Sequence, residues 1–198
     1  MAFPKQNFTT SKDGSGTYAT TSGAVLKIES VIGDNRIVEF KAFLTTLNQN
    51  FSSTWNSEDV YGRNDPIATF QGTKRTISLA WDVPAASFDE ARDNLERTGL
   101  LTQLLYPGYA SNVIAKPPLV KVKFANLIKN SLNNEGLLGY IDSLAINPVL
   151  DMGMFNAGKE FFPKVISLSF NLNVLHQHDL GISGSAGVRR AKATKFPF

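Results

Sequence analysis

Residues 165–175 form the most regular pattern in the chain and constrain its fold more than any other segment. Apolar and polar residues alternate there at every position from Ile166 to Val174. The apolar set is Ile166, Leu168, Phe170, Leu172 and Val174, and the polar set is Ser167, Ser169, Asn171 and Asn173. A period of two places the two sets on opposite faces of a β-strand, so the apolar face is expected to lie on a core. The polar face lacks the Lys or Glu that usually blocks pairing, so we expect it to be covered or to line a lumen.

Other segments carry β patterns of the same kind. In residues 73–83, Arg75 and three apolar residues alternate with small residues, and Pro84 ends the segment. Residues 25–32 and 36–47 flank Gly33-Asp34-Asn35, which is typical of a hairpin turn. Residues 137–146 form a further apolar run. The chain is therefore predicted to be rich in antiparallel strands.

One helix is predicted over residues 87–105. Ser87 and Glu90 have the spacing of a capping box, and Asp89-Glu90 places negative charge in the first turn, where the helix dipole favours it. An apolar stripe follows, made of Phe88, Ala91, Leu95, Thr98, Leu101 and Leu105. Tyr106-Pro107-Gly108-Tyr109 stops the helix. We expect this helix to cover one face of a sheet.

Composition sets the fold class and the domain organisation. A chain of 198 residues with 42% hydrophobic and 19% charged residues suits one domain with a sizeable core. We predict an α+β, mainly β fold: an antiparallel β-barrel or sandwich with one flanking helix and extended terminal arms. Residues 1–23 form an N-terminal arm, 24–180 the β domain, and 181–198 a flexible basic arm. The terminal Phe196-Pro197-Phe198 either docks on a neighbour or remains a free end, and both readings stay open.

Several function classes are disfavoured by composition. The chain has no Cys, which excludes disulfides, thiol catalysis and Cys-ligated metals. Its net charge of +3 comes largely from the C-terminal arm, so it does not predict nucleic-acid binding. No run approaches the ~20 apolar residues of a membrane span, and the N-terminus lacks the apolar core of a signal peptide. We therefore expect neither membrane insertion nor export.

Candidate catalytic and metal-binding groups are sparse. His176 and His178 would share a face of a strand, and a third ligand, Asp151 or Glu160, would have to approach in space. Such residues more often end a strand with polar groups, so we predict no metal site. No nucleophile elbow and no phosphate-binding glycine loop is present. We expect no enzyme activity and no cofactor, and a hydrolase assembled from distant residues remains the weakest alternative.

A dense segment at residues 55–67 is the strongest candidate for an interaction surface. It combines aromatic, charged and turn-forming residues without catalytic spacing. The candidate interface residues here are Trp55, Glu58, Asp59, Tyr61, Arg63 and Asp65, to which the terminal Phe196 and Phe198 are added. Guanidinium groups are favoured in interfacial ion pairs. We therefore expect Arg63 to pair with a carboxylate from Glu58, Asp59 or Asp65, or with its equivalent on a neighbouring subunit.

A second reading places the function on residues 120–124. Val120, Val122 and Phe124 alternate there with Lys121 and Lys123. A basic face with a stacking aromatic is typical of proteins that bind single-stranded nucleic acid. A small nucleic-acid-binding β-barrel that uses Lys121, Lys123 and Phe124 is therefore the alternative. A solvated strand face is the simpler interpretation of the same pattern.

The sequence also resembles a known family over roughly residues 36–180. The matching residues are Trp55-Asn56-Ser57-Glu58, Val60-Tyr61-Gly62-Arg63, Asp65-Pro66-Ile67, Thr76-Ile77-Ser78-Leu79-Ala80-Trp81, Pro84-Ala85, Glu90-Ala91, Asn94-Leu95, Leu105-Tyr106-Pro107 and, more loosely, Pro163 to Val165 with the last strand. This set resembles the tail-tube-like baseplate proteins, or tube initiators, of contractile-tailed bacteriophages.

That resemblance implies a tail-tube type of β-barrel or sandwich that assembles into a six-fold ring around a channel. It implies a structural virion protein of the tail baseplate that is made in the host cytoplasm. Its partners would be further copies of itself, the hub or spike below and the tail tube that it templates, with DNA only as passing cargo. We expect the strands at 165–175 and 36–47 to line the channel or the ring joints.

Overall fold

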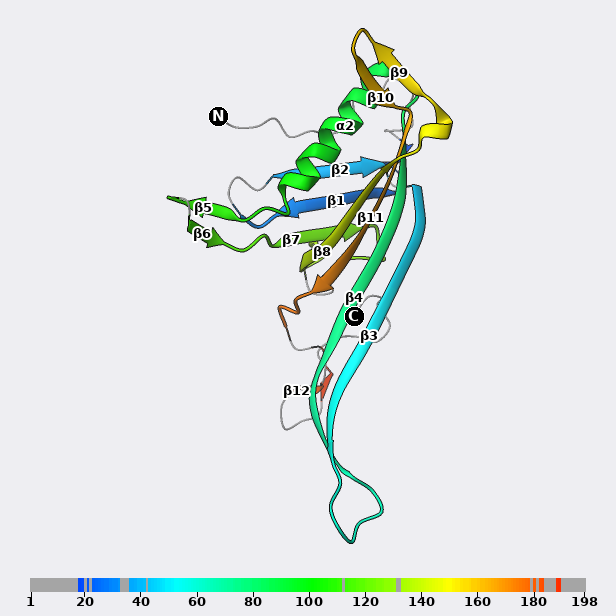
Figure 1. Cartoon of the computed structure of the whole chain (residues 1–198). Coiled ribbons are helices and arrows are strands. Elements are labelled where there is room, and N and C mark those ends of the chain that lie inside the picture. The colour runs from blue at the N-terminus through cyan, green and yellow to red at the C-terminus, as the bar shows by residue number, and fades with distance from the viewer. Residues whose placement is uncertain are drawn as a thin grey trace.

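The structure, a computed structural model, describes residues 18–19, 21, 23–32, 36–41, 43–111, 113–130, 133–178, 180, 182–183 and 188–189. Its main element is a seven-stranded antiparallel sheet with strand order β2-β1-β7-β8-β11-β4-β3 (Figure 1). The strands are β1 (Val25–Ser30), β2 (Ile37–Lys41), β3 (Phe43–Glu58), β4 (Ile67–Pro84), β7 (Val120–Phe124), β8 (Leu137–Pro148) and β11 (Val165–Val174). With one long helix beside this sheet, the expected mainly β, α+β class is confirmed.

Short strand pairs complete the described structure. They are β5 (Gly108–Ala110) with β6 (Val113–Lys116), β9 (Met154–Ala157) with β10 (Glu160–Pro163), and β12 (Ile182–Ser183) with β13 (Val188–Arg189). A 3₁₀ helix, Leu150–Met152, leads into β9. In Figure 1 the β5–β6 and β9–β10 pairs project from the body of the sheet in different directions.

The sheet changes direction at β8. The first residues of β8 pair with β7, where Leu137 lies opposite Val122, and from Gly139 onward β8 pairs with β11. A bulge at Asp142 bends the strand further, since the register shifts between Asn171 and Leu172. As a result β1, β2 and β7 run across the molecule in Figure 1, while β3, β4 and β11 run along it. Because of this bend, the two halves of one continuous sheet pack around the same core.

The predicted barrel is not formed. Within the described residues, β2 pairs only with β1, and β3 pairs only with β4. The strands β2 and β3 therefore form the two opposite edges of an open sheet. The single strand expected over residues 36–47 is also wrong, because β2 ends at Lys41 and β3 begins at Phe43. At this point the chain leaves one edge of the sheet and enters the other. The predicted hairpin turn at residues 33–35 lies outside the described residues, although β1 and β2 pair as a hairpin would.

Alternation in the strands produces the core as predicted. The five alternating apolar residues of β11, from Ile166 to Val174, are buried, and Ile77, Leu79 and Trp81 of β4 are buried beside them. Trp81 lies at the centre: its ring centroid is 5.6 Å from that of Phe40 in β2 and 5.4 Å from that of Phe170. The same cluster includes residues of β1 and β7, so both halves of the bent sheet share one core.

The helix α2 (Phe88–Gln103) lies over this core and begins as the sequence predicts. The Ser87 hydroxyl accepts a hydrogen bond from the Glu90 backbone N–H at 3.3 Å. Ala91 and Leu101 are buried, but Leu95 is 38% exposed, so the predicted stripe is wrong at that position. Polar Asn94 and Arg97 are buried instead. Apolar spacing could not reveal this, because both side chains are polar and the Arg97 guanidinium donates a hydrogen bond to Asn94 inside the fold.

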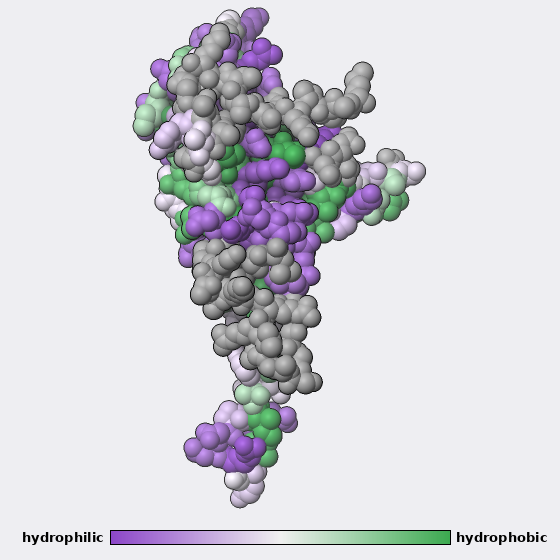
Figure 2. Space-filling model, turned by 180° about the vertical axis from the view of Figure 1, so that it is seen from behind, coloured by the Kyte–Doolittle hydropathy of each residue, from purple (hydrophilic) through white to green (hydrophobic). Residues whose placement is uncertain are grey.

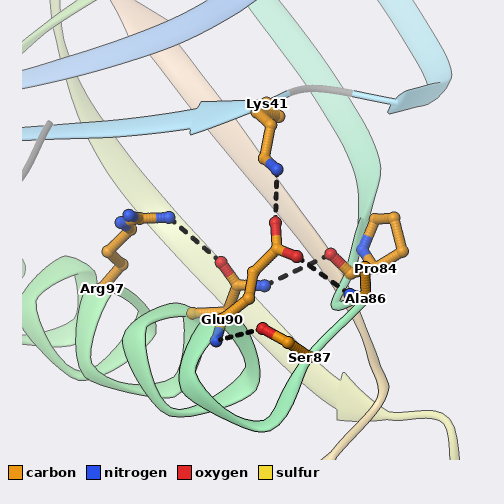
Figure 3. A network of polar contacts seen from close by, with 7 residues as sticks. Lys41, Pro84, Ala86, Ser87, Glu90 and Arg97 are labelled. Atoms are coloured by element: carbon orange, nitrogen blue, oxygen red, sulfur yellow. Dashed lines mark hydrogen bonds and ion pairs between the residues drawn. The ribbon is translucent and has the colours of Figure 1, made fainter. Parts of the chain in front are cut away.

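A polar network fixes the start of α2 to both halves of the sheet (Figure 3). Lys41, at the end of β2, forms an ion pair with Glu90, and both side chains are nearly buried. The second carboxylate oxygen of Glu90 accepts a hydrogen bond from the Ala86 backbone N–H at 2.9 Å. Asn94 donates to the Pro84 carbonyl at 3.3 Å and accepts from Arg97 at 3.1 Å. The Asp89-Glu90 pair therefore has a structural role through Glu90.

Gly139 is expected to tolerate no side chain. A Cβ at this position would lie 2.4 Å from the Asn173 carbonyl oxygen and 2.9 Å from Leu172 Cδ1. Gly139→Ala should therefore lower the free energy of unfolding by about 1–3 kcal/mol, as overpacking generally does. Gly72→Ala is the matched control, because nothing lies within 4 Å of the added Cβ. Urea denaturation of both variants measures the difference, and equal stability would show that β8 and β11 can separate without cost.

Breaking the Lys41–Glu90 pair should destabilise the fold. Glu90→Gln leaves a nearly buried ammonium without its counter-charge, so we expect a loss of about 2–4 kcal/mol in the free energy of unfolding. The double variant Lys41→Met/Glu90→Gln should recover much of that loss, because no unpaired charge remains. Glu96→Gln, which breaks the exposed Arg92–Glu96 pair, should cost under about 0.5 kcal/mol. A Glu90→Gln protein as stable as Glu96→Gln would contradict this role.

Candidate functional site

The β3–β4 hairpin extends well beyond the rest of the sheet. The neighbouring strand β11 reaches only to Asn173, opposite Thr76 of β4, whereas β3 and β4 continue pairing from Phe51–Arg75 to Glu58–Ile67. At about 3.3 Å per residue, this two-stranded part is about 26 Å long. Figure 1 shows it running down from the body to a loop at the end. We call this part of the molecule the hairpin arm.

Large apolar side chains lie exposed on the hairpin arm. Trp55 and Phe70 are 58% and 52% exposed, and their rings contact each other edge to face with centroids 5.1 Å apart. Tyr61, at the end of the arm, is fully exposed. In Figure 2 hydrophobic and hydrophilic side chains lie side by side at this end. A two-stranded ribbon is marginal on its own and exposed apolar clusters mark binding surfaces, so the arm has the character of an interaction site.

The predicted interface residues 55–65 all lie on this arm. Trp55 and Glu58 belong to β3, while Asp59, Tyr61, Arg63 and Asp65 lie in the connection to β4. Strand pairing continues to Glu58 and resumes at Ile67, so only residues 59–66 form the connection between β3 and β4. The sequence does not reveal this extension, because Ser, Asn and Thr interrupt the alternation of apolar and polar residues in β3. Phe196 and Phe198 lie outside the described residues.

The backbone turn at the end of the arm includes the charged residue Arg63. Gly62 adopts φ 87°, and the Arg63 backbone N–H donates to the Val60 carbonyl at 3.2 Å. Among the described residues, no ion pair joins Arg63 to Glu58, Asp59 or Asp65. The interfacial ion pair of Arg63 therefore stays a prediction.

Two further hairpins expose apolar residues, and the sequence did not indicate either of them. Around β5–β6 the exposed side chains are Tyr106, Tyr109, Val113 and Ile114. Around β9–β10 they are Leu150, Met152, Met154 and Phe161. The strands of both pairs are too short to show the period of two that predicts a strand. The segment Tyr106-Pro107-Gly108-Tyr109 indicates only the end of a helix, so it does not predict a hairpin. Together with the hairpin arm, they direct apolar surface away from the body on several sides.

The outer face of β11 is polar, as its alternation predicts, and it forms a ladder of side-chain hydrogen bonds with its neighbours. The donor–acceptor pairs are Ser78–Asn171 (2.7 Å), Asn171–Ser143 (3.0 Å), Thr76–Asn173 (3.3 Å), Asn173–Asp142 (2.9 Å) and Ser167–Asp82 (2.6 Å). A shallow groove crosses this face where the small residues Thr46, Ala80, Ala145 and Ser169 lie in register. The ladder fixes side chains that would otherwise be free, so the face is smooth and carries little charge.

The β3 edge is long and unprotected. Over Phe43–Glu58 the strand contains no Lys, Arg or Pro, and its one charge is the terminal Glu58. In the described part of the chain, β3 pairs with β4 alone, so its other backbone groups face outward. Such an edge is a template for pairing with another strand.

The residues of the alternative reading do not form a nucleic-acid surface. Phe124 is 7% exposed and belongs to the core, so its ring cannot stack on a base. The Lys121 ammonium is 3.0 Å from the Glu135 carboxylate, an ion pair that also lowers the pKa of Glu135. In the described ranges, no three His, Cys, Asp or Glu residues are grouped as a metal site requires, and no helix has the length and hydropathy to cross a membrane.

Comparison with known proteins gives little further guidance. No family model matches the sequence, and no curated protein matches it either. Among solved structures, the chain is similar to one from the cryo-electron-microscopy structure of the anti-feeding prophage baseplate, six-fold symmetrised. The two share 11% sequence identity with a TM-score of 0.32, and the match covers 77% of this chain and 88% of the other. A TM-score of 0.32 does not establish a common fold.

His176, just beyond β11, should make stability fall in mild acid. Burial lowers the pKa of His176 below its ordinary value of 6.5, and the charges of Arg75 and His178 lower it further. Below pH 6.5 the unfolded chain therefore binds a proton more readily than the folded chain, so the free energy of unfolding decreases as the pH falls through that value. His176→Asn should reduce this decrease, which urea denaturation above and below pH 6.5 measures. If His176→Asn has the same pH dependence of stability as the wild type, His176 does not cause the loss of stability in acid.

Proposed function

We propose that this chain is a non-enzymatic structural subunit of a tail baseplate, of the kind found in contractile-tailed phages. The observation that carries the proposal is the hairpin arm with its exposed Trp55–Phe70 pair. An enzyme needs a cleft with convergent polar groups, whereas a subunit of an assembly needs projecting apolar surfaces. The sequence resemblance over residues 36–180 supports the same class.

In this proposal the subunits close into a hexameric ring. The β3 edge of one subunit pairs with an edge of the next, which satisfies backbone groups that an isolated subunit leaves open. The polar face of β8, β11, β4 and β3 then lines the channel. Its hydrogen-bonded hydroxyl and amide groups offer few charges to hold DNA, so DNA passes through as cargo.

The projecting hairpins make the contacts between layers of the assembly. The hairpin arm inserts its aromatic pair against an adjacent ring, where Arg63 pairs with a carboxylate of the neighbour. The neighbouring proteins are the baseplate hub on one side and the tail tube, which the ring templates, on the other. The subunit is made in the host cytoplasm and ends in the virion.

Removing the aromatic pair should abolish association without unfolding the subunit. Trp55→Ser/Phe70→Ser changes residues that lie outside the core, so the free energy of unfolding should change by at most about 1.5 kcal/mol, the value of one aromatic contact. The concentration-dependent association of the purified chain, measured by sedimentation and light scattering, should be lost. Electron microscopy of the wild-type particles measures the number of subunits in each ring.

Leu95→Ser is the control, since Leu95 is also exposed but lies on α2, away from the hairpins. It should associate like the wild type. A strictly monomeric wild-type protein at every accessible concentration, or a double variant that associates normally, would overturn the proposed role of the arm.

A further inference from the structure

Arg75 lies at the root of the hairpin arm, and one of its buried donors lacks an acceptor. The residue is 2% exposed, and its guanidinium lies 5.2 Å from the centre of the Phe51 ring. One terminal nitrogen donates to the Gln49 side-chain oxygen at 2.6 Å. The Nε–H is buried and has no hydrogen-bond partner within the described residues. Desolvation accordingly lowers the pKa of Arg75.

A buried donor of this kind needs a partner. Without one it carries its full desolvation cost. Buried polar groups in native proteins are therefore almost always bonded, either by the protein or by an ordered water molecule. A guanidinium has donors only, so the missing partner of the Arg75 Nε–H is an acceptor. Because Arg75 is almost closed to solvent, that acceptor also has to be small.

The space beside Arg75 has the size of one water molecule. The volume open to the centre of a water is about 10 Å³, which is close to the least that a single buried water requires. The polar residues that line this space are Lys129, Asn130, His176, Gln177 and His178, and leucine side chains complete the lining. Asn130 donates to the Gln177 side-chain oxygen at 3.1 Å. A water is stable in such a space only where polar groups offer it hydrogen bonds, and this lining provides them.

The guanidinium is also held in a fixed position. The Gln49 side-chain nitrogen donates to the Leu127 carbonyl at 3.2 Å, while its oxygen accepts from Arg75. Gln49 thus connects β3 and β4 to the segment that follows β7. A donor fixed in this way presents its Nε–H in one direction, so a small acceptor beside it would also be held in one place.

We propose that this space is a binding site for one structural water molecule. The water oxygen accepts the hydrogen bond of the Arg75 Nε–H. The water donates in turn to acceptors of the lining, one of which is the Gln177 side-chain oxygen, since a carbonyl oxygen that accepts from Asn130 keeps a second lone pair. The water thereby connects β4, at the root of the hairpin arm, to the segment after β11. The site is a property of one subunit and does not depend on the proposed assembly.

A high-resolution crystal structure of the full chain tests the site directly. One density peak is expected about 2.9 Å from Arg75 Nε, the usual length of an N–H···O hydrogen bond. Crystals grown with bromide in place of chloride distinguish water from a halide ion, because only bromide gives an anomalous signal at the peak. No density peak, an anomalous signal at the peak, or an Nε–H bonded to a protein acceptor would each overturn the proposal.

NMR of the same chain in solution measures whether the water stays bound. The Arg75 Nε–H resonance, assigned by its loss in Arg75→Lys, should show an NOE from water that is opposite in sign to the corresponding ROE, as a long-lived bound water gives. The Nε–H of Arg92, whose side chain is 60% exposed, is the matched control and should show no such NOE.

Lys129→Met separates bound water from the exchanging protons of the nearby ammonium, which could produce a similar NOE. Lys129 is only partly buried, so this change leaves the core intact. The NOE at Arg75 should persist in Lys129→Met. An NOE that disappears in this variant, or that is missing in the wild type, would show that no long-lived water binds the Arg75 Nε–H.

Discussion

The structure depends on the packing of two differently directed halves of one sheet around Trp81. This residue contacts Phe40 from one half and Phe170 from the other, and neither half could bury its apolar face alone. The bend that brings the halves together needs Gly139, because any Cβ there would collide with the Asn173 carbonyl. Trp81 and Gly139 therefore both lie where the two halves of the sheet meet. The helix α2 then closes the remaining side of the core.

The bend of the sheet also brings together the groups that form the polar network at the start of α2. Where β2 ends at Lys41 and β4 ends at Pro84, two sheet ends converge on the first turns of the helix. Glu90 and Asn94 satisfy backbone and charged groups from both. The network has the geometry of a structural joint, because Glu90 and Asn94 bind groups of β2, of the segment from Pro84 to Ala86 and of α2 itself.

A rigid body with projecting hairpins is suited to assembly. The core holds β3 and β4 firmly up to Thr76, and beyond that point the hairpin arm has no strand to either side in the described structure. Exposed aromatics on the arm gain free energy only when another surface covers them. The buried Arg75 lies at the root of the arm, where the body of the sheet and the projecting hairpin meet.

Sequence by itself determined the strand faces and the helix cap, because both depend on neighbours within a few positions. The alternation of β11 and β4 predicted the buried residues, and Ser87 with Glu90 predicted the start of α2. It also indicated Trp55 to Asp65 as an interaction surface, which stays a prediction. Only the tertiary structure decided that the sheet stays open, that Asn94 and Arg97 replace Leu95 in the interior, and that Arg75 is buried without a carboxylate. These features depend on contacts between residues far apart in the chain, which local periodicity does not record.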